Sequence, residues 1–238
     1  MHQSLFGNIL RPALIGFLSV SCAVSAETIA IIGTGQVGGA LGPEFAALGH
    51  DIVYGSREPG RDDVRALVVR TGDGARATTP AEAVRDARIV VLAVPGMAVE
   101  QITTSLGDLS GKIVIDPTNA LVSRADGQFE MGVETSNAEI IQAAAPGAHV
   151  VKAFNTLNWR TMVDPDSAGG PVTIPLVGND AAAKAVVAGL VEDLGLEAID
   201  LGPLENARYV EGMLILWFNN RSSGREAFEY HLRKRTAN

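Results

Sequence analysis

An apolar run that ends directly in a glycine-rich turn constrains this chain more than any other feature. Residues 29–32 are continuously apolar, which is typical of a strand buried on both faces. A G-x-G-x-x-G pattern follows and opens a helical stretch that closes at Gly49; its residues are Gly33, Thr34, Gly35, Gln36, Val37 and Gly38. In this context the pattern predicts a dinucleotide-binding turn, in which Gly33 allows the bend, Gly35 admits a pyrophosphate and Gly38 lets the helix pack on the strand. A glycine-rich turn without a ligand is the alternative.

The second expected strand, residues 51–55, ends where such folds distinguish NAD from NADP. An NAD-binding chain usually has an Asp or Glu there, about 20 residues past the glycines, to bind the ribose hydroxyls. This chain has Ser56 and Arg57 instead, with Arg61 a turn later. A hydroxyl and a guanidinium suit a 2′-phosphate, since a charged hydrogen bond contributes about 1.5–3 kcal/mol. The residues predict NADP(H); alternatively, Arg57 is an exposed loop cation and Ser56 a helix cap.

Strand-like and helix-like stretches alternate through the rest of the chain. Helices are expected over 80–86 and 181–194, and strands over 75–78, 88–94, 112–116, 149–154, 172–177 and 197–200. This alternation predicts an α/β fold of the Rossmann type, with a doubly wound, mostly parallel sheet. We expect a dinucleotide-binding domain over residues 27–156 and a small C-terminal helical extension, residues 157–238, that packs on it.

Polar or turn-forming residues follow three of these strands, as Val94-Pro95-Gly96, Asp116-Pro117-Thr118-Asn119 and Asn155-Thr156. Ligands bind at the carboxyl edge of open α/β sheets, so these strand ends predict a floor for a nicotinamide ring and its reaction partner. Each residue is also an ordinary turn former, and a purely structural role for any one of them stays open.

Two helical stretches carry unusual features. Pro43 interrupts the hydrogen-bond ladder of the first helix, where we expect a kink or a loosened turn. Residues 204–228 have helical spacing with an apolar stripe, which indicates core or a dimer contact; its members are Tyr209, Met213, Leu216, Trp217 and Phe228.

Residues 1–26 have the pattern of a cleavable export signal. Arg11 precedes an apolar run over 12–20, and small residues at Val24 and Ala26 have the spacing of a signal-peptidase site. The run is too short to span a bilayer, so we expect no membrane insertion of the mature chain. We expect a periplasmic protein that starts at Glu27; an N-terminal extension of a cytoplasmic enzyme is the alternative.

The composition excludes several classes of protein. The chain has 238 residues, 47% of them hydrophobic and 19% charged, and is therefore too apolar for a disordered protein. Its formal net charge of -8 argues against a nucleic-acid partner, since affinity for phosphate backbones comes from clustered Lys and Arg. Cys22 is the single cysteine, which excludes an internal disulfide and a Cys-based metal site, and we expect no metal.

Taken together, the motifs resemble one family over residues 28 to about 220. They are the glycine-rich turn, Gly55-Ser56-Arg57, Val94-Pro95-Gly96, Lys152-Ala153-Phe154-Asn155-Thr156, Val177-Gly178-Asn179-Asp180 and Gly202-Pro203-Leu204-Glu205-Asn206-Ala207-Arg208. This set is similar to the deazaflavin (coenzyme F420)-dependent NADP oxidoreductases and the related reductase domains of the STEAP metalloreductases.

The resemblance implies direct hydride transfer between NADPH and a flavin-like ring such as coenzyme F420 or a flavin, often in a homodimer. It places the pyrophosphate at the glycine-rich turn, the 2′-phosphate at Ser56 and Arg57, and the nicotinamide between Val94 and Pro95. Asn155 and Thr156 would line the pocket of the second ring. Transfer between two stacked rings needs no catalytic acid or base, and the sequence shows no such set.

Two other functions remain open. One is an NADP-dependent reductase of a small imine or keto acid, although relatives with that chemistry usually carry a long helical substrate domain and about 80 residues follow Thr156. The other is a non-catalytic NADP-binding sensor, which would show the same nucleotide motifs.

Overall fold

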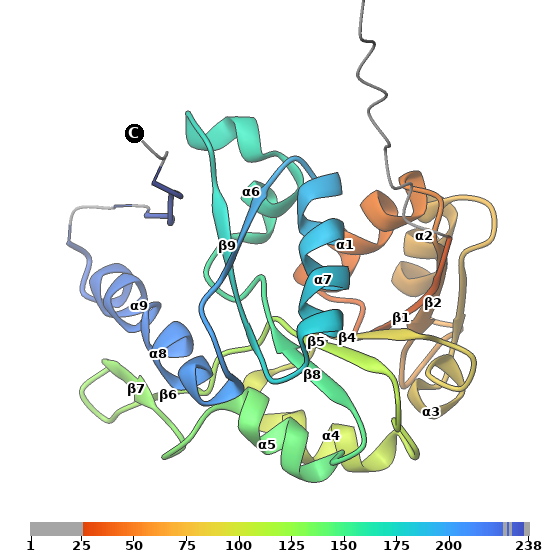
Figure 1. Ribbon diagram of the computed structural model, residues 1–238, viewed down its shortest axis with the longest axis horizontal. Helices are drawn as coiled ribbons and strands as arrows, with labels where there is room; N and C mark the ends of the chain where they lie inside the picture. Colours follow the sequence, from red (N-terminus) through yellow and green to blue (C-terminus); the bar gives the residue numbers. More distant parts are fainter. Residues whose placement is uncertain (1–25, 226–227, 229, 236–238) are drawn as a thin grey trace, which may run out of the picture.

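A single mixed sheet organises the computed structural model, which describes residues 26–225, 228 and 230–235 (Figure 1). In this part of the chain the sheet has eight strands in the order β10-β9-β8-β5-β4-β1-β2-β3. Their bounds are β1 Thr28–Ile32, β2 Asp51–Gly55, β3 Arg76–Thr78, β4 Ile89–Leu92, β5 Ile113–Asp116, β8 His149–Lys152, β9 Thr173–Gly178 and β10 Glu197–Asp200. Neighbouring strands run parallel except β8 and β9, which are antiparallel. The predicted Rossmann-like α/β fold is confirmed.

Helices cover both faces of the sheet because alternate side chains of each buried strand point to opposite faces. On β1, Ile29 and Ile31 pack in one core with α1 (Gln36–Ala47), α2 (Asp62–Thr71), α6 (Trp159–Val163) and α7 (Ala181–Asp193). Ala30 and Ile32 pack in the other core with α3 (Pro80–Ala83), α4 (Val99–Ser105), α5 (Asn137–Ala144) and α8 (Ala207–Gly212). The sheet is therefore doubly wound, as predicted.

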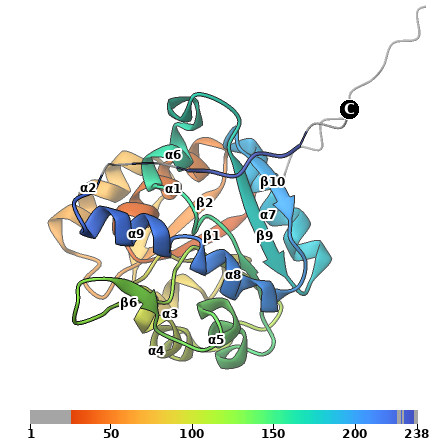
Figure 2. The ribbon, with the colours of Figure 1, turned by 90° about the vertical axis from the view of Figure 1, so that its left-hand side faces the viewer.

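The chain after Thr156 shares this sheet. It contributes β9 and β10 along the edge next to β8, and then α8 and α9 (Ile215–Ser222). In Figures 1 and 2, α8 and α9 lie outside the sheet, beside the antiparallel hairpin of β6 (Leu121–Ser123) and β7 (Phe129–Met131). The expected extension is thus joined to the dinucleotide-binding part by strand pairing as well as by helix packing.

Several predicted element ends are wrong. The strand expected over 149–154 ends at Lys152, because Phe154 adopts a positive φ of 64° that no strand accommodates. The helix expected over 80–86 ends at Ala83, and the strand expected over 88–94 spans only Ile89–Leu92. The β6–β7 hairpin and helices α2, α4, α5 and α6 were not predicted; each of these elements has ten residues or fewer.

The long helix expected over 204–228 is broken into a 3-10 turn, α8 and α9. Its apolar stripe is not a continuous core: Tyr209 and Leu216 are 72% and 74% exposed, whereas Trp217 lines a cavity described below. By contrast, α1 continues through Pro43 without interruption. The carbonyl of Gly39, which loses its donor to the proline, accepts a hydrogen bond from Arg70 Nη2 at 3.0 Å.

Within the described residues, no helix is both long and apolar enough to cross a bilayer. The predicted signal segment lies outside the described residues except for Ala26.

Candidate functional site

The glycine-rich turn joins β1 to α1 through two close backbone approaches. Gly33 has a φ of 106°, and a Cβ there would lie 2.1 Å from the carbonyl oxygen of Ala93. A Cβ at Gly38 would lie 2.1 Å from the carbonyl oxygen of Gly33. A side chain at Gly35, in contrast, would meet no atom within 4 Å. The turn thus excludes side chains at two positions and leaves open space at the third, where the motif expects a ligand.

The N-terminus of α1 opens onto that space. Gly35 is the N-cap and offers no side-chain hydrogen bond, and the first turn contains no acidic residue. The first N–H groups of a helix have no partner within the helix, and the helix dipole favours an anion at this end. The residues present therefore fit the pyrophosphate of a dinucleotide.

The residues predicted for the 2′-phosphate follow β2. Ser56 is buried and its hydroxyl accepts a hydrogen bond from the backbone N–H of Glu58 at 3.2 Å, so it also organises a local turn. Arg57 is exposed at the same strand end. Arg61 is different, because its guanidinium already binds Asp63, with 3.0 Å between Nη2 and Oδ2. This ion pair raises the pKa of Arg61 and lowers that of Asp63.

The ends of β4 and β5 meet next to this turn. Val94 would lie 3.5 Å from a Cβ at Gly33, and a Cβ at Gly96 would lie 2.0 Å from the carbonyl oxygen of Asn119. The Pro95–Gly96 turn can therefore sit against the β5 loop only because residue 96 lacks a side chain.

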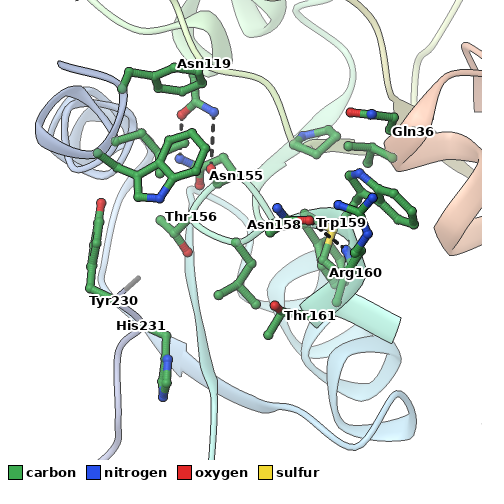
Figure 3. A pocket seen from close by; sticks show the side chains of 18 of the residues that line it. Gln36, Asn119, Asn155, Thr156, Asn158, Trp159, Arg160, Thr161, Tyr230 and His231 are labelled. Atoms are coloured by element: carbon green, nitrogen blue, oxygen red, sulfur yellow. Dashed lines mark hydrogen bonds between the residues drawn. The ribbon is translucent and has the colours of Figure 1, made fainter. Parts of the chain in front are cut away.

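A buried amide pair marks the ends of β5 and β8. Asn155 Nδ2 donates to Asn119 Oδ1 at 2.9 Å and to the carbonyl of Val210 at 3.1 Å, and Asn119 Nδ2 donates to the carbonyl of Asn155 at 3.2 Å (Figure 3). Asn155 is 2% exposed, yet its Oδ1 has no hydrogen-bond partner within the described residues. The oxygen itself is buried, and a buried acceptor without a partner is costly.

Behind the amide pair lies a buried charge network that sequence reasoning missed. Lys152 Nζ is 2.6 Å from Asp116 Oδ2, 2.8 Å from Glu211 Oε1 and 2.6 Å from the carbonyl of Thr118, and the three charged side chains are fully buried. Burial raises the pKa of Glu211, and the Lys152 ammonium opposes this shift. The network ties α8 to the ends of β5 and β8. A lysine in an otherwise apolar strand was the available signal, since a buried cation needs a carboxylate partner.

A cavity of about 900 Å³ opens at this edge of the sheet. Four predicted site residues line it, namely Gln36, Val37, Asn155 and Thr156. Pro117 and Asn119, two further residues of the predicted strand ends, also line it, as does Phe129 of β7. The rest of the lining comes from residues 154–168, from residues 214–222 around α9, and from Tyr230 and His231; Figure 3 shows Trp159, Arg160, Tyr230 and His231 around the cavity. Among the described residues, the lining does not include Gly33, Thr34, Gly35, Gly38, Ser56, Arg57, Arg61, Val94 or Pro95. The cavity therefore borders the glycine-rich turn at Gln36 and Val37 and excludes the other predicted residues of the nucleotide site.

Comparison with known proteins agrees with this geometry. Residues 28–120 match the family model described as NADP oxidoreductase, coenzyme F420-dependent. An F420-dependent NADP reductase from Methanothermobacter thermautotrophicus is 31% identical over 206 residues, which cover 80% of this chain and 88% of that relative. The chain belongs to this family. The predicted resemblance is confirmed, and membership makes the protein an NADP-dependent oxidoreductase.

Two further similarities extend the comparison. A solved structure of a candidate F420-dependent NADP reductase from Arthrobacter sp. FB24 has a TM-score of 0.79 at 34% identity, covering 88% of this chain and all of the other. Metalloreductase STEAP3 from Rattus norvegicus is 29% identical over 189 residues, which are 79% of this chain. The match covers 36% of that metalloreductase, so this chain spans about a third of its length.

Proposed function

We propose that this protein transfers a hydride between NADP(H) and a flavin-like acceptor, either a deazaflavin such as coenzyme F420 or a flavin. In this proposal, residues 27–156 bind the dinucleotide and residues 157–238 close the acceptor cavity over the nicotinamide. The main support for this proposal is the position of the cavity. Gln36 and Val37 of the glycine-rich turn line it on one side, and residues of α6 and α9 also line it. A dinucleotide held at the turn can therefore extend its nicotinamide end toward this space.

On the dinucleotide side, the backbone of the turn and the N-terminus of α1 hold the pyrophosphate. Ser56 and Arg57 bind the 2′-phosphate, and Val94 and Pro95 flank the nicotinamide. Arg61 contributes less than the sequence suggested, because Asp63 already occupies its guanidinium.

On the acceptor side, Asn155 and Thr156 orient the reacting rings. The Asn155 side chain is held in place by Asn119 and by the carbonyl of Val210, so this part of the cavity wall is rigid. The apolar side chains of Phe154, Leu157 and Trp217 exclude water. When bound, the nicotinamide supplies or accepts the hydride, so the protein needs to provide orientation and a dry site, not an acid or base.

The test is NADPH oxidation by the purified full-length protein, followed by the loss of NADPH absorbance. Coenzyme F420, FMN, FAD and a ferric chelate are supplied in turn, with NADH as the matched control. We expect oxidation with a flavin-like acceptor and little with NADH. Turnover of a small imine or keto acid alone would assign the protein to that class of reductase, and tight NADPH binding without any turnover would assign it to the sensors.

We also propose that the protein is exported and cleaved after Ala26. The support is the sequence of the first 26 residues. Intact-mass measurement on protein from its native host should give a chain that begins at Glu27, and retention of residues 1–26 would reject the cleavable signal.

Finally, we propose a homodimer. The resemblance implies it, and Tyr209 and Leu216 expose large apolar surfaces on α8 and α9. Sedimentation equilibrium of the purified protein should give twice the mass of the chain, and a Leu216→Glu variant should shift it toward the monomer.

A further inference from the structure

We infer that Glu211 is a positioning residue for the acceptor side of the cavity, where it holds the loop after β5 from helix α8. The inference rests on the proposed function, because it assigns a role at that same site to a residue that does not line it. Asp116, Lys152 and Glu211 form the buried charge network, and none of them is among the residues that line the cavity. Any effect of Glu211 on the reaction must therefore pass through the residues that it holds.

The loop after β5 alternates between the network and the cavity. The backbone N–H and the hydroxyl of Thr118 both donate to Asp116 Oδ1, at 2.8 and 2.7 Å, and the carbonyl of Thr118 accepts from Lys152 Nζ at 2.6 Å. The residues on either side of Thr118, Pro117 and Asn119, line the cavity. Hydrogen bonds that fix Thr118 therefore also fix the two neighbours that form the cavity wall.

Glu211 holds the end of this loop from a distant helix. Its Oε2 accepts the backbone N–H of Ala120 at 3.0 Å, and its Oε1 accepts that of Ala138, in the first turn of α5, at 3.4 Å. Lys152 Nζ lies 2.8 Å from the same Oε1. Ala120 is fully buried, so without this carboxylate its N–H would lose its acceptor away from water. Glu211 thus joins α8, α5 and the β5 loop at one point.

The residue before Glu211 holds a second part of the cavity wall. The carbonyl of Val210 accepts a hydrogen bond from Asn155 Nδ2 at 3.1 Å, and Asn155 also donates to Asn119 Oδ1 at 2.9 Å (Figure 3). After α8 the chain continues into α9, whose Trp217 lines the cavity. A shift of α8 would therefore move the amide pair and the α9 wall together.

A carboxylate is required at residue 211 because its three partners are all donors, namely two backbone N–H groups and an ammonium group. A glutamine has nearly the same shape but only one oxygen, so its NH2 group would face either Ala120 or Lys152. Apolar side chains could fill the same space, and a buried ion pair contributes little net stability relative to them. They lack the directional hydrogen bonds that hold the loop in one position.

The test uses the fluorescence of Trp159 and Trp217, because they are the two tryptophans of the chain and both line the cavity. Acrylamide quenching is measured on full-length protein saturated with NADP+. We expect Glu211→Gln to increase the quenching, since the loop and α8 no longer close the wall. NADP+ affinity should stay within about threefold, because the glycine-rich turn and the 2′-phosphate site are unchanged. Thr118→Val removes one loop anchor without changing any charge, and it should give a smaller increase.

Leu106→Ala is the matched control. Leu106 is buried at the end of α4 and does not line the cavity, so the variant lowers stability through a core void and should leave the quenching unchanged. With FMN as the acceptor, Glu211→Gln should lower kcat for NADPH oxidation about tenfold or more, since displaced rings react slowly, whereas Leu106→Ala should keep it.

Unchanged quenching in Glu211→Gln, or an equal increase in Leu106→Ala, would overturn the inference. A loss of NADP+ affinity in Glu211→Gln as large as the loss of kcat would also overturn it, because the role would not be specific to the acceptor side. If Glu211→Gln does not fold, Thr118→Val decides, and unchanged quenching in that variant overturns the inference. If no acceptor oxidises NADPH, the proposed function fails, while the quenching still decides whether Glu211 positions the cavity wall.

Discussion

The two ends of this site are built in different ways. At the dinucleotide end, consecutive residues from Gly33 to Gly38 form the turn, and the critical contacts are between backbone atoms. At the acceptor end, the parts come from distant segments: the backbone N–H of Ala120 donates to Glu211, 91 residues away. A local turn depends on one short motif, whereas an assembled pocket depends on the whole fold. At the dinucleotide end the outcome of a substitution should depend on which glycine of the turn is changed, whereas at the acceptor end the loss of a buried charge should lower stability.

The largest effect is expected from Lys152→Met in the buried charge network. The variant leaves Asp116 and Glu211 buried without their cation, which should lower the free energy of unfolding by about 3–5 kcal/mol. Denaturant unfolding measures it. Lys184→Met is the control, since its partner Asp200 is largely exposed and the expected loss is about 0–1 kcal/mol. Equal losses at the two lysines would show that the network does not hold the acceptor end together.

Gly38→Ala and Gly35→Ala sharpen the contrast within the turn. A methyl at Gly38 clashes with the backbone of Gly33 and should cost about 1–3 kcal/mol of stability. A methyl at Gly35 meets no protein atom, so the unfolding free energy should stay within about 0.5 kcal/mol while NADPH affinity falls about tenfold or more. Thermal unfolding and NADPH titration of both variants separate the two effects. Unchanged NADPH binding in the Gly35 variant would show that the pyrophosphate does not lie against residue 35.

Arg57→Ala should weaken NADPH binding by about ten- to a hundredfold and leave NADH nearly unchanged, because only NADPH carries the 2′-phosphate. Arg61→Ala offers the matched comparison. Its guanidinium is already paired with Asp63, so we expect a change of less than about threefold. Equal losses of NADPH and NADH affinity in the Arg57 variant would contradict the NADP assignment.

The smallest effect concerns pH. The pKa of Glu211 is raised above its ordinary value of 4.5, so the folded protein binds this proton more tightly than the unfolded chain does. The contribution of Glu211 to stability is therefore present below pH 4.5 and is lost as the pH rises through the raised value. Glu211→Gln should remove this dependence. We therefore measure the unfolding free energy of both proteins from acidic to neutral pH. The stability of the unmodified protein relative to the variant should fall as the pH rises. A difference that does not change with pH would contradict the raised pKa of Glu211.

Much of the fold could be predicted because its signals are local. The strands buried on both faces and the glycine-rich turn identify a doubly wound sheet before any tertiary contact is known. Element ends were harder to predict, as at Phe154, where the loop imposes a positive φ and the strand stops two residues early. The β6–β7 hairpin carries no strong periodicity, and it is held by α9, where Asn219 Nδ2 donates to the carbonyl of Phe129 at 3.0 Å.

Some residues of the candidate site could be predicted from the sequence, and others could not. Strand-end position was sufficient to nominate Asn155 and Thr156, and both line the cavity. The role of Glu211 could not be predicted, because no residue near it in the sequence indicates that it pairs with Lys152 in the folded protein. The sequence also could not show that Arg160 and Arg221 line the same cavity or that Arg221 lies against Trp217.

The sequence by itself determined the Rossmann-like fold and the dinucleotide turn, because backbone conformation and strand burial depend on neighbouring residues. Only the tertiary structure decided the acceptor end. There, α8 packs against α5, α9 packs against the β6–β7 hairpin, and a buried lysine meets two carboxylates. The charges of Lys152, Asp116 and Glu211 lie far apart along the chain, and they interact strongly only because folding brings them together and removes water from around them.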